Sequence, residues 1–422
     1  YGVQFHPEVV HTANGRQILT NFLFDICGCA PDWDPRGSLQ AVEDHIREVV
    51  GDRNVFFFVS GGVDSTVAFT LCLRALGDDR VSGYYVDTGL MREDETDHVR
   101  EMFVSLGSRN FSIEDAHSQF LSALDGIADP EKKRHVIGQE FVSVQERILR
   151  TGHFLEGNWI LGQGTIYPDT IESGGTAKAD LIKTHHNRVA GIQKLIEEKR
   201  IVEPLSFFYK DEVRAIGKEL GLPEAFLNRH PFPGPGLAIR CLCAEQDAEP
   251  RRIQDGWIIP VRSVGVQGDE RSYRPVLAIR GEDLHARATE LVNRHAEINR
   301  VIAEVQLEEP IEQMRVRPAM LSRARLDLLR KADAIVRRIC IGTGFEEQVW
   351  QFPVVLIPFG SSTGPDSVVL RPVDSVDGMT AASVAIPPAV LQSIALEILS
   401  LPGIGGVFHD LTHKPPGTIE WE

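Results

Sequence analysis

Residues 58–66 read Phe58-Val59-Ser60-Gly61-Gly62-Val63-Asp64-Ser65-Thr66. They lie where an apolar run, residues 55–59, gives way to a helical pattern, so a strand-to-helix turn is predicted here. Such a turn offers free backbone N–H groups at the positive end of the helix dipole, and both features bind phosphate oxygens. Gly61 and Gly62 let the backbone approach an anion without a Cβ in the way. No Lys follows the glycines, so this is not a Walker A loop.

The side chains of the turn also suit a nucleotide. Ser60, Ser65 and Thr66 can donate hydroxyl hydrogen bonds to phosphate oxygens. Asp64 cannot bind a phosphate directly, but its carboxylate suits a Mg²⁺ ion that bridges phosphates. The alternative is an ordinary serine-glycine turn with an N-capping residue, and the residues of the turn alone leave it open.

On both sides of this turn, strand-like runs alternate with amphipathic helical patterns, from about residue 38 to residue 220. Strands are expected at 54–59, 80–86 and 159–162, and helices at 65–76, 96–106 and 210–220, the last with Ser206 as its N-cap. This alternation predicts an α/β fold, a doubly wound parallel sheet with helices on both faces. Ligands bind such sheets at the carboxyl edge, where the turn and Val86-Asp87-Thr88-Gly89 would lie.

A second group of polar residues lies between residues 162 and 187. Asp169 and Glu172 could hold or orient a metal ion. Lys183, His185 and His186 can stabilise the charge that develops at an α-phosphate, and residues 173–176 have the composition of a mobile flap. Adjacent histidines alone are more often surface residues than catalysts, so this interpretation depends on the neighbouring phosphate loop.

The rest of the chain predicts further domains. Residues 229–236, Arg-His-Pro-Phe-Pro-Gly-Pro-Gly, cannot continue a helix and mark a domain boundary, although a rigid loop beside basic residues also suits a phosphate or a base ring. Beyond it, a strand–loop–strand–helix–strand pattern occurs twice, over 258–305 and 355–411, which predicts an α+β domain of two repeated modules. Chance similarity of short units is the alternative. A short helix is expected over 16–29, before a Pro- and Gly-rich linker.

The composition limits the possible functions. A chain of 422 residues predicts about three domains, at roughly 150 residues each. Its net charge of −16 argues against a broad nucleic-acid or membrane surface, and no apolar run approaches the ~20 residues that span a bilayer. Six cysteines are too few for a disulfide scaffold, and the C-x-C pairs at 27/29 and 241/243 lack the usual zinc spacing. We expect a cytoplasmic protein with reduced thiols.

Several motifs together carry a family resemblance. They are S-G-G-V-D-S-T at 60–66, I-K-T-H-H-N at 182–187, R-H-P-F-P-G-P-G-L at 229–237 and K-P-P-G-T-I-E-W-E at 414–422. The first resembles the pyrophosphate loop of N-type ATP pyrophosphatases, and all four in this order resemble the GMP synthase family over nearly the whole chain. The resemblance implies that ATP adenylates the C2 oxygen of XMP with loss of pyrophosphate, and that ammonia, normally from glutamine, then displaces AMP. It implies ATP and Mg²⁺ as cofactors, and XMP, ATP and glutamine or ammonia as partners.

The resemblance also implies roles for individual residues. Ser60, Gly61, Gly62, Val63, Asp64, Ser65 and Thr66 would hold the pyrophosphate of ATP, and Asp64, Asp169 and Glu172 would bind Mg²⁺ or position ATP. Lys183, His185 and His186 would belong to a catalytic lid. XMP contacts are implied at Arg134, Pro233, Gly234, Pro235, Arg271, Gln351, Lys414 and Glu420. Of these, Arg271 and Lys414 suit the 5′-phosphate, and Gln351 and Glu420 suit a purine edge or the ribose.

Residues 2–9, Gly-Val-Gln-Phe-His-Pro-Glu-Val, resemble the end of a class I glutamine amidotransferase. In that family the His is the general base for a cysteine nucleophile and the Glu orients it, which implies catalytic roles for His6 and Glu8. The nucleophile is expected upstream, because Cys27 and Cys29 follow the His and are not at a strand-to-helix elbow. We therefore expect these 422 residues to use free ammonium but not to hydrolyse glutamine. The implied division is 1–30 for this remnant, 31–38 for the linker, 39–236 for the adenylating domain and 237–422 for the XMP-binding domain.

Three other functions share part of the pattern. A tRNA-modifying enzyme with the same loop would need a basic surface, which the net charge opposes. NAD synthetase shares S-G-G-x-D-S but would need neither Arg271 nor the 414–422 motif, and a nucleotide sensor would have no use for Asp64, Lys183 and His186. Release of pyrophosphate that depends on XMP would separate these. The duplicated module, as in the family's long form, predicts an internal pseudo-dimer and a monomer, with a homodimer as the alternative.

Overall fold

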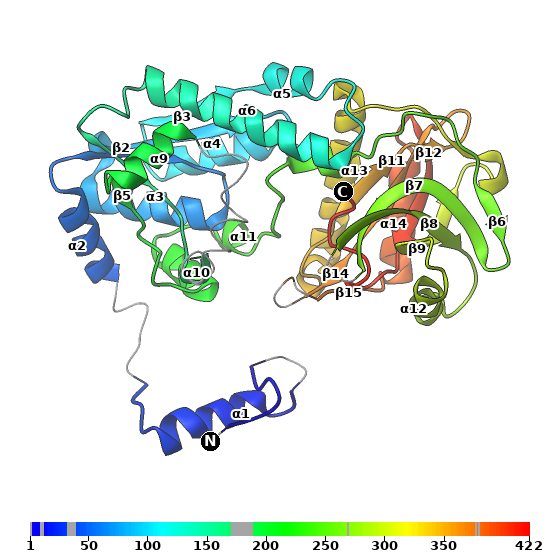
Figure 1. Cartoon of the computed structure of the whole chain (residues 1–422), viewed down its shortest axis with the longest axis horizontal. Coiled ribbons are helices and arrows are strands. Elements are labelled where there is room, and N and C mark those ends of the chain that lie inside the picture. The colour runs from blue at the N-terminus through cyan, green and yellow to red at the C-terminus, as the bar shows by residue number, and fades with distance from the viewer. Residues whose placement is uncertain are drawn as a thin grey trace.

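The computed structural model describes residues 2–8, 12–31, 39–169, 189–267, 270–375, 378 and 380–422. It contains an N-terminal segment, a parallel-sheet domain and a mixed-sheet domain (Figure 1). The N-terminal segment forms α1 (Gly15–Thr20) and the π-helix η1 (Asn21–Ile26), so its helical part ends at Ile26 and not at residue 29. Residues 32–38 of the expected linker lie outside the described residues. In the described part of the chain, no helix combines the length and apolar character that a bilayer span requires.

Five parallel strands form the first sheet, in the order β3-β2-β1-β4-β5. They are β1 (Asn54–Phe58), β2 (Val81–Asp87), β3 (Phe111–Asp115), β4 (Trp159–Gly162) and β5 (Ile201–Val202). The α/β prediction is therefore confirmed, and the strands expected at 54–59, 80–86 and 159–162 are present within a residue at each end. Strand β1 lies at the centre of the sheet, and its carboxyl end leads directly into the glycine turn.

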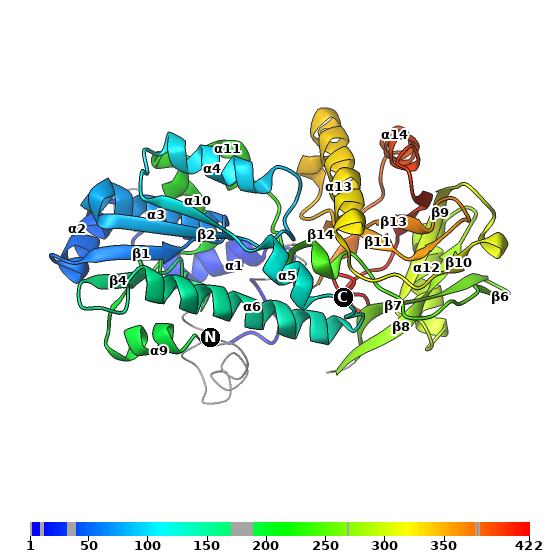
Figure 2. The same cartoon turned by 90° about the horizontal axis from the view of Figure 1, so that it is seen from above.

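Helices cover both faces of this sheet (Figure 2). They are α2 (Leu39–Val50), α3 (Val63–Leu76), α4 (Glu95–Ser105), α5 (His117–Ala123), α6 (Pro130–Thr151), α9 (Ala190–Glu197), α10 (Lys210–Glu219) and α11 (Glu224–Leu227), with the 3₁₀ turn η3 (Asp78–Arg80). Neighbouring residues of β1 point to opposite faces. Phe57 packs in one core with α2, α3, α4 and α10, and Phe56 in another with α5, α6 and α9. This is the predicted doubly wound arrangement.

The start of α10 corrects one prediction, because Ser206 is not its N-cap. The N-cap is Tyr209, whose backbone N–H donates to the carboxylate of Glu212 at 2.8 Å. Ser206 lies in a preceding turn, closed by the Phe208 N–H donating to the Leu205 carbonyl at 3.0 Å and anchored by the buried Phe208 side chain. The helix therefore begins at Lys210, which places that cation beside the carboxyl edge of the sheet.

The C-terminal domain is built on a seven-stranded mixed sheet, in the order β11-β13-β16-β9-β8-β7-β6. Its strands are β6 (Arg251–Ile253), β7 (Gly256–Gln267), β8 (Glu270–Ile279), β9 (Arg300–Leu307), β11 (Val354–Ile357), β13 (Asp366–Leu370) and β16 (Ile404–Asp410). Shorter strands are β10 (Arg315–Val316), β12 (Phe359–Gly360), β14 (Val373–Asp374) and β15 (Ala382–Ser383). The helices are α12 (Leu284–Arg294), α13 (Arg323–Thr343) and α14 (Pro388–Leu399), and the 3₁₀ turns are η4 (Gly236–Ile239), η5 (Ile311–Gln313) and η6 (Glu346–Gln348).

The two copies of the predicted repeat form the two halves of this sheet. The first copy is β7, β8, α12 and β9, and the second is β11, β13, α14 and β16. Each copy is an antiparallel hairpin whose second strand pairs in parallel with the strand after the helix. Ile279 lies opposite Ala303 in the first copy, as Leu370 lies opposite His409 in the second. The expected duplication is therefore present in the topology and in the register.

The copies meet where β9 and β16 pair antiparallel, with Ala303 opposite His409. Because these two residues hold equivalent places in their copies, an approximate twofold axis passes between them. One residue further along each strand, Glu304 and Asp410 are equivalent as well. The axis thus reproduces, inside one chain, the symmetry of a dimer of modules.

Ion pairs at equivalent positions of the two copies have different surroundings. In the first copy Arg280 pairs with Glu304, and the Arg280 side chain is 60% exposed. In the second copy Arg371 pairs with Asp410 at 2.9 Å, and both side chains are completely buried. Arg300 is a second buried partner of Asp410, also at 2.9 Å. The second copy therefore holds one carboxylate between two guanidiniums in its interior.

The last residues of the chain close over this buried cluster. The Trp421 indole Nε1 donates to Asp410 at 2.8 Å, and Arg371 donates to the Thr418 carbonyl at 2.7 Å. Arg300 donates to the Glu420 carbonyl at 2.8 Å. Both cartoon views place the C-terminus at the junction of the two large domains (Figures 1 and 2). The cluster thereby fixes the position of the K-P-P-G-T-I-E-W-E segment.

Candidate active site

The turn between β1 and α3 is open to an anion. Gly61 has a φ of +73°, and a Cβ there would lie 3.1 Å from a methyl of Val99. Gly62 is the extended N-cap of α3, and its N–H donates to the Ser60 hydroxyl at 3.2 Å. The hydroxyls of Ser60 and Ser65 lie 3.0 Å apart. The first N–H groups of α3 have no partner within the helix, so they are available to phosphate oxygens.

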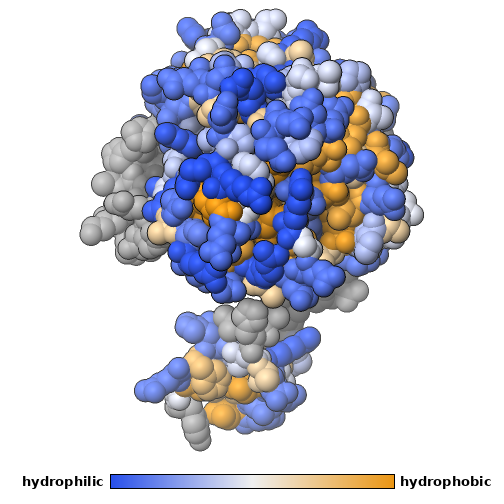
Figure 3. Space-filling model, turned by 90° about the vertical axis from the view of Figure 1, so that its right-hand side faces the viewer, coloured by the Kyte–Doolittle hydropathy of each residue, from blue (hydrophilic) through white to orange (hydrophobic). Residues whose placement is uncertain are grey.

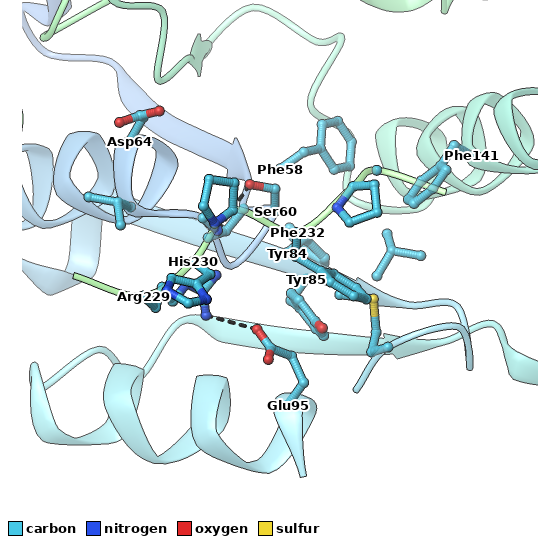
Figure 4. A pocket seen from close by; sticks show the side chains of 18 of the residues that line it. Phe58, Ser60, Asp64, Tyr84, Tyr85, Glu95, Phe141, Arg229, His230 and Phe232 are labelled. Atoms are coloured by element: carbon cyan, nitrogen blue, oxygen red, sulfur yellow. Dashed lines mark hydrogen bonds and ion pairs between the residues drawn. The ribbon is translucent and has the colours of Figure 1, made fainter. Parts of the chain in front are cut away.

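A cavity of about 370 Å³ opens beside this turn (Figure 4). Figure 4 shows Asp64 and Arg229 toward one end of the cavity and Phe141 toward the other. Aromatic side chains of the wall suit a flat base, and the charged end suits phosphates. The cavity is lined by Phe58, Val59, Ser60, Gly62, Val63, Asp64, Tyr84, Tyr85, Val86, Met91, Glu95, Phe141, Gln145, Lys210, Arg214 and residues 229–234. Its shape and chemistry therefore suit a nucleoside triphosphate.

Lys210 and Arg214, which were not predicted from the sequence, line the cavity together with Arg229 of the 229–236 loop. Lys210 and Arg214 stand one turn apart on α10, and the Lys210 Nζ lies 2.5 Å from Oδ2 of Asp64. Arg229 pairs with Glu95 at 2.8 Å and donates to the carbonyl of Gly61, which joins the 229–236 loop to the glycine turn. The usable signal in the sequence was the position of α10: the helix follows β5 and begins at Lys210, so this lysine lies at the carboxyl edge of the sheet.

Asp64 retains one free carboxylate oxygen. Its Oδ1 is buried and accepts no hydrogen bond from the described residues, whereas Oδ2 is held by Lys210. A buried carboxylate oxygen that receives no hydrogen bond is well suited to bind a metal ion. Asp169 lies in the turn after β4, where its carboxylate accepts the N–H of Ile166 at 3.2 Å. Among the described residues no three His, Cys, Asp or Glu side chains form a metal cluster, so a cation here would take other ligands from phosphate oxygens or water.

Gly164 packs directly on the phosphate turn. A Cβ at Gly164 would lie 2.8 Å from both the Cα and the N of Ser65, so either the turn or the strand β4 extension must shift to admit it. If the turn holds ATP, as the family resemblance implies, Gly164→Ala should raise the KM for ATP about tenfold, because the N–H groups at the start of α3 move. The KM for XMP should stay within about twofold, since the alanine meets no residue implied in XMP contact.

Gly342→Ala is the matched control for this glycine substitution. Gly342 is an exposed helix residue of α13, and a Cβ there meets no atom within 4 Å. Steady-state kinetics of both variants measure the effect. A Gly164→Ala enzyme with an unchanged KM for ATP would mean that the packing of residue 164 does not set the shape of the turn.

Four residues predicted for the site lie outside the described residues. They are Glu172, Lys183, His185 and His186. The described residues that flank them are tied to the sheet, since the Gln163 N–H donates to the Val202 carbonyl at 3.0 Å and the Thr165 hydroxyl donates to Glu203 at 2.6 Å. Their roles remain predictions from the sequence.

The residues predicted to contact XMP fall into separate groups. Pro233 and Gly234 line the 370 Å³ cavity beside the phosphate turn, and Pro235 leads into η4. Arg134 of α6 lies at the domain junction, where its guanidinium donates to the backbone carbonyl of Glu422. The preceding residue, Lys133, is buried and pairs with the Glu422 carboxylate at 2.6 Å. Burial raises the pKa of Glu422 to about 7, against the opposing charge of Lys133.

Arg271 also reaches the junction. Its guanidinium lies 3.0 Å from Glu131, at the start of α6, and the hydroxyl of Tyr273 donates to the same carboxylate at 2.7 Å. The hydrogen bond from Tyr273 and the charge of Arg271 together lower the pKa of Glu131. The structure thus brings Arg271 and Arg134 to the same end of α6.

Glu420 lies beside the end of η4, which Arg240 follows. Its carboxylate accepts two hydrogen bonds from Arg240, at 2.9 Å from Nε and 2.7 Å from Nη2. The Lys414 ammonium donates to the carbonyl of Gly378, and the Gln351 Oε1 is buried and accepts no hydrogen bond from the described residues. In the described part of the chain, neither Lys414 nor Gln351 forms a hydrogen bond or ion pair with Arg271.

His6 and Glu8 contact each other in the N-terminal segment. The His6 Nδ1 lies 2.7 Å from the Glu8 carboxylate, and both side chains are exposed. Hydrogen bonds from the backbone and from His6 lower the pKa of Glu8. A carboxylate on Nδ1 leaves Nε2 available as a base, which is the pairing expected of a general base and its orienting residue.

Three family models match parts of the chain. Residues 341–421 match the GMP synthase C terminal domain, residues 38–170 match NAD synthase, and residues 1–26 match glutamine amidotransferase class-I. The matches follow the same order as the three parts of the structure.

Curated relatives match over the whole length of the chain. A probable GMP synthase (glutamine-hydrolyzing) of Leptospira interrogans is 42% identical, over 100% of this chain and 73% of its own length. A GMP synthase (glutamine-hydrolyzing) of Thermobifida fusca is 38% identical, over 100% of this chain and 68% of its own. Among solved structures, an NH3-dependent NAD synthetase from Campylobacter jejuni is 20% identical with a TM-score of 0.34, covering 46% of this chain and 77% of that one.

Proposed function

Because this chain belongs to the GMP synthase family, we propose that it aminates XMP to GMP at the expense of ATP, as a carbon–nitrogen ligase. The C2 oxygen of the xanthine attacks the α-phosphorus of ATP, and the bond to the bridging oxygen breaks, so that pyrophosphate leaves. Ammonia then adds at C2 and the C2–O bond breaks, so that AMP leaves with the oxygen. The products are GMP, AMP and pyrophosphate. The observation that carries the proposal is the cavity that joins the glycine turn to Lys210 and Arg229.

The described residues can stabilise the leaving pyrophosphate. The N–H groups at the start of α3 and the hydroxyls of Ser60 and Ser65 would bind its oxygens. Lys210 and Arg214 add positive charge at the same end of the cavity. Negative charge builds up on the pyrophosphate as it leaves. Fixed hydrogen-bond donors around it stabilise this charge, because they need not reorganise during the reaction. The aromatic wall formed by Phe58, Tyr84 and Phe141 would hold the adenine.

A magnesium ion fits the same end of the cavity. Asp64 would hold it through the carboxylate oxygen that accepts no bond from the described residues, with Asp169 and Glu172 as the further proposed ligands. Bound there, the ion would neutralise charge on the phosphates of ATP. Lys210 must then share Asp64 with the ion or turn toward the phosphates.

XMP would bind at the domain junction. Arg134 and Arg271 come from the two large domains and lie at the start of α6. Arg134 contacts Glu422, two residues after Glu420, and Glu420, Gln351 and Lys414 are proposed to complete the site. Pro233, Gly234 and Pro235 would form the wall between the two nucleotides. Lys183, His185 and His186 are proposed to close over the α-phosphate. His6 and Glu8 would serve the glutamine-hydrolysing reaction that supplies ammonia.

Release of pyrophosphate tests the proposal. The 422-residue chain, given ATP, Mg²⁺ and ammonium, should release pyrophosphate when XMP is added, and GMP and AMP should appear in equal amounts. Ammonium replaces glutamine, so the assay does not depend on glutamine hydrolysis. An NAD synthetase would respond to deamido-NAD instead of XMP, and a nucleotide sensor would release pyrophosphate with neither. Either result would contradict the proposal.

The internal twofold axis supports a monomer. The antiparallel pairing of β9 with β16 already joins two modules as two subunits would. Figure 3 shows hydrophilic side chains over most of this face of the C-terminal domain, with apolar side chains near its centre and toward its right-hand side. Among the described residues of this domain, the exposed large apolar side chains are Ile341 and Leu396. We expect light scattering to give a mass near 46.9 kDa, and a mass near twice that value would favour the homodimer. We also propose that the protein acts in the cytoplasm.

A further inference from the structure

Phe232 connects the ATP cavity to the domain junction. Its side chain lines the cavity, and the ring is contacted by two guanidiniums. Arg240 lies with its Cζ 5.3 Å from the ring centroid, and Arg92 lies 4.6 Å from it. Arg240 also holds Glu420 through the two hydrogen bonds described above. A continuous series of contacts therefore leads from the ATP cavity through Phe232 and Arg240 to Glu420.

The burial of Arg240 is costly. Its side chain is 1% exposed, whereas that of Glu420 is 17% exposed. The Arg240 Nη1 is buried and finds no hydrogen-bond acceptor among the described residues. A buried ion pair usually contributes little net stability, because desolvation offsets the attraction between the charges. What the planar guanidinium does supply is a fixed orientation for the carboxylate that it holds with two donors.

We propose that Arg240 is a positioning residue for XMP, which fixes the Glu420 carboxylate and couples its position to occupancy of the ATP cavity through Phe232. The proposal rests on the proposed function, in which Glu420 contacts XMP. Arg240 itself touches neither substrate in this scheme. When adenine and ribose press on Phe232, the ring transmits the displacement to Arg240, because tightly packed groups move together. ATP binding thereby favours the orientation of Glu420 that accepts XMP.

The chain contains a matched control for this residue. Arg92 contacts the same ring, and its side chain is 7% exposed, but it pairs with Asp333 of α13 at 3.4 Å and not with Glu420. A substitution at Arg92 therefore disturbs the packing of Phe232 without removing a donor from Glu420. An effect that depends on Glu420 should appear at position 240 and be absent at position 92.

The test compares Arg240→Lys with Arg92→Lys, which both keep the charge and remove the planar fork. Arg240→Lys should raise the KM for XMP about tenfold, which corresponds to the loss of one charged hydrogen bond. Because coupling between two ligands is reciprocal, the affinity for a non-hydrolysable ATP analogue should stay within about twofold only when it is measured without XMP. Arg92→Lys should leave the KM for XMP within about twofold. The dissociation constant of XMP, measured by calorimetry with and without a non-hydrolysable ATP analogue, should follow the same pattern. The tightening of XMP caused by the analogue should disappear in Arg240→Lys.

A double-mutant cycle shows whether Arg240 acts through Glu420. The KM for XMP of Arg240→Lys/Glu420→Gln should equal that of Glu420→Gln alone, because the second change removes the group that the first one positions. If Arg240→Lys does not fold, Arg240→Met/Glu420→Met is compared with Glu420→Met, and equal XMP affinities are again expected.

Two results would overturn the role of Arg240: equal effects of Arg240→Lys and Arg92→Lys on XMP, or additive effects in the cycle. The proposed function fails separately, if the unsubstituted chain releases no pyrophosphate on addition of XMP. Calorimetry still decides about Arg240 in that case, since binding requires no turnover, and a chain that does not bind XMP at all would overturn both.

Discussion

Asp64→Asn is expected to lower the rate of XMP-dependent pyrophosphate release by on the order of 100-fold or more. The amide keeps the size of the side chain but removes the negative charge from the oxygen that accepts no bond from the described residues. Without that charge the proposed Mg²⁺ binds more weakly, so the Mg²⁺ concentration for half-maximal rate should rise as well. Both quantities come from initial rates measured at several Mg²⁺ concentrations.

Two further variants show whether the effect of Asp64→Asn comes from loss of a metal ligand. Asp44→Asn is the control, because Asp44 is an exposed carboxylate of α2 that pairs with Arg47, away from the cavity. Lys210→Met removes the other partner of Asp64. It should raise the KM for ATP and leave the Mg²⁺ requirement unchanged, which separates loss of a metal ligand from loss of the ion pair. A normal rate for Asp64→Asn at saturating Mg²⁺ would remove Asp64 from the mechanism.

Asp410→Asn is expected to destabilise the C-terminal domain by about 3–5 kcal/mol, because it leaves two buried guanidiniums without a counter-charge. Burial alone would raise the pKa of Asp410, but the charges of Arg371 and Arg300 hold it below its usual value. The carboxylate is therefore ionised at neutral pH, and its removal leaves Arg300 and Arg371 facing each other. Burial, with the charge of Arg371, already lowers the pKa of Arg300 to about 9. Urea unfolding, followed by tryptophan fluorescence, measures the loss.

The equivalent residue of the first copy provides the control. Glu304 holds the place of Asp410 across the approximate twofold axis, and its partner Arg280 is 60% exposed. Glu304→Gln should cost at most about 1 kcal/mol, since Arg280 can turn to solvent. The fluorescence of Trp421, which donates to Asp410, should change in Asp410→Asn and stay constant in Glu304→Gln. If both variants lose the same stability, then burial of the Asp410 ion pairs does not make them contribute more than the exposed pair of Glu304 and Arg280.

Local patterns predicted the first sheet well. The central strand β1 is almost entirely apolar and buried on both faces, and a run of that kind next to glycines has few other stable arrangements. The N-cap of α10 was predicted wrongly, because Ser206 is a good capping residue in isolation. The burial of Phe208 decided the start of that helix, and burial depends on the rest of the fold.

Individual site residues were harder to predict. The glycine turn was found because its chemistry lies in consecutive residues, and the cavity does open beside it. Lys210 and Arg214 were missed, since about 145 residues separate them from the turn and nothing in a local window links them to it. The residues implied for XMP stay a prediction, and the structure divides them between the cavity and the domain junction.

From the sequence alone came the parallel sheet, the glycine turn after β1, the duplicated module and the family, because each depends on periodicity or on motifs that are continuous along the chain. The tertiary structure alone decided which distant charges meet. It paired Asp64 with Lys210, Glu420 with Arg240 and Asp410 with Arg300 and Arg371. The physical reason is that a side chain's partner and its degree of desolvation are set by the packing of whole elements, which no short stretch of sequence contains.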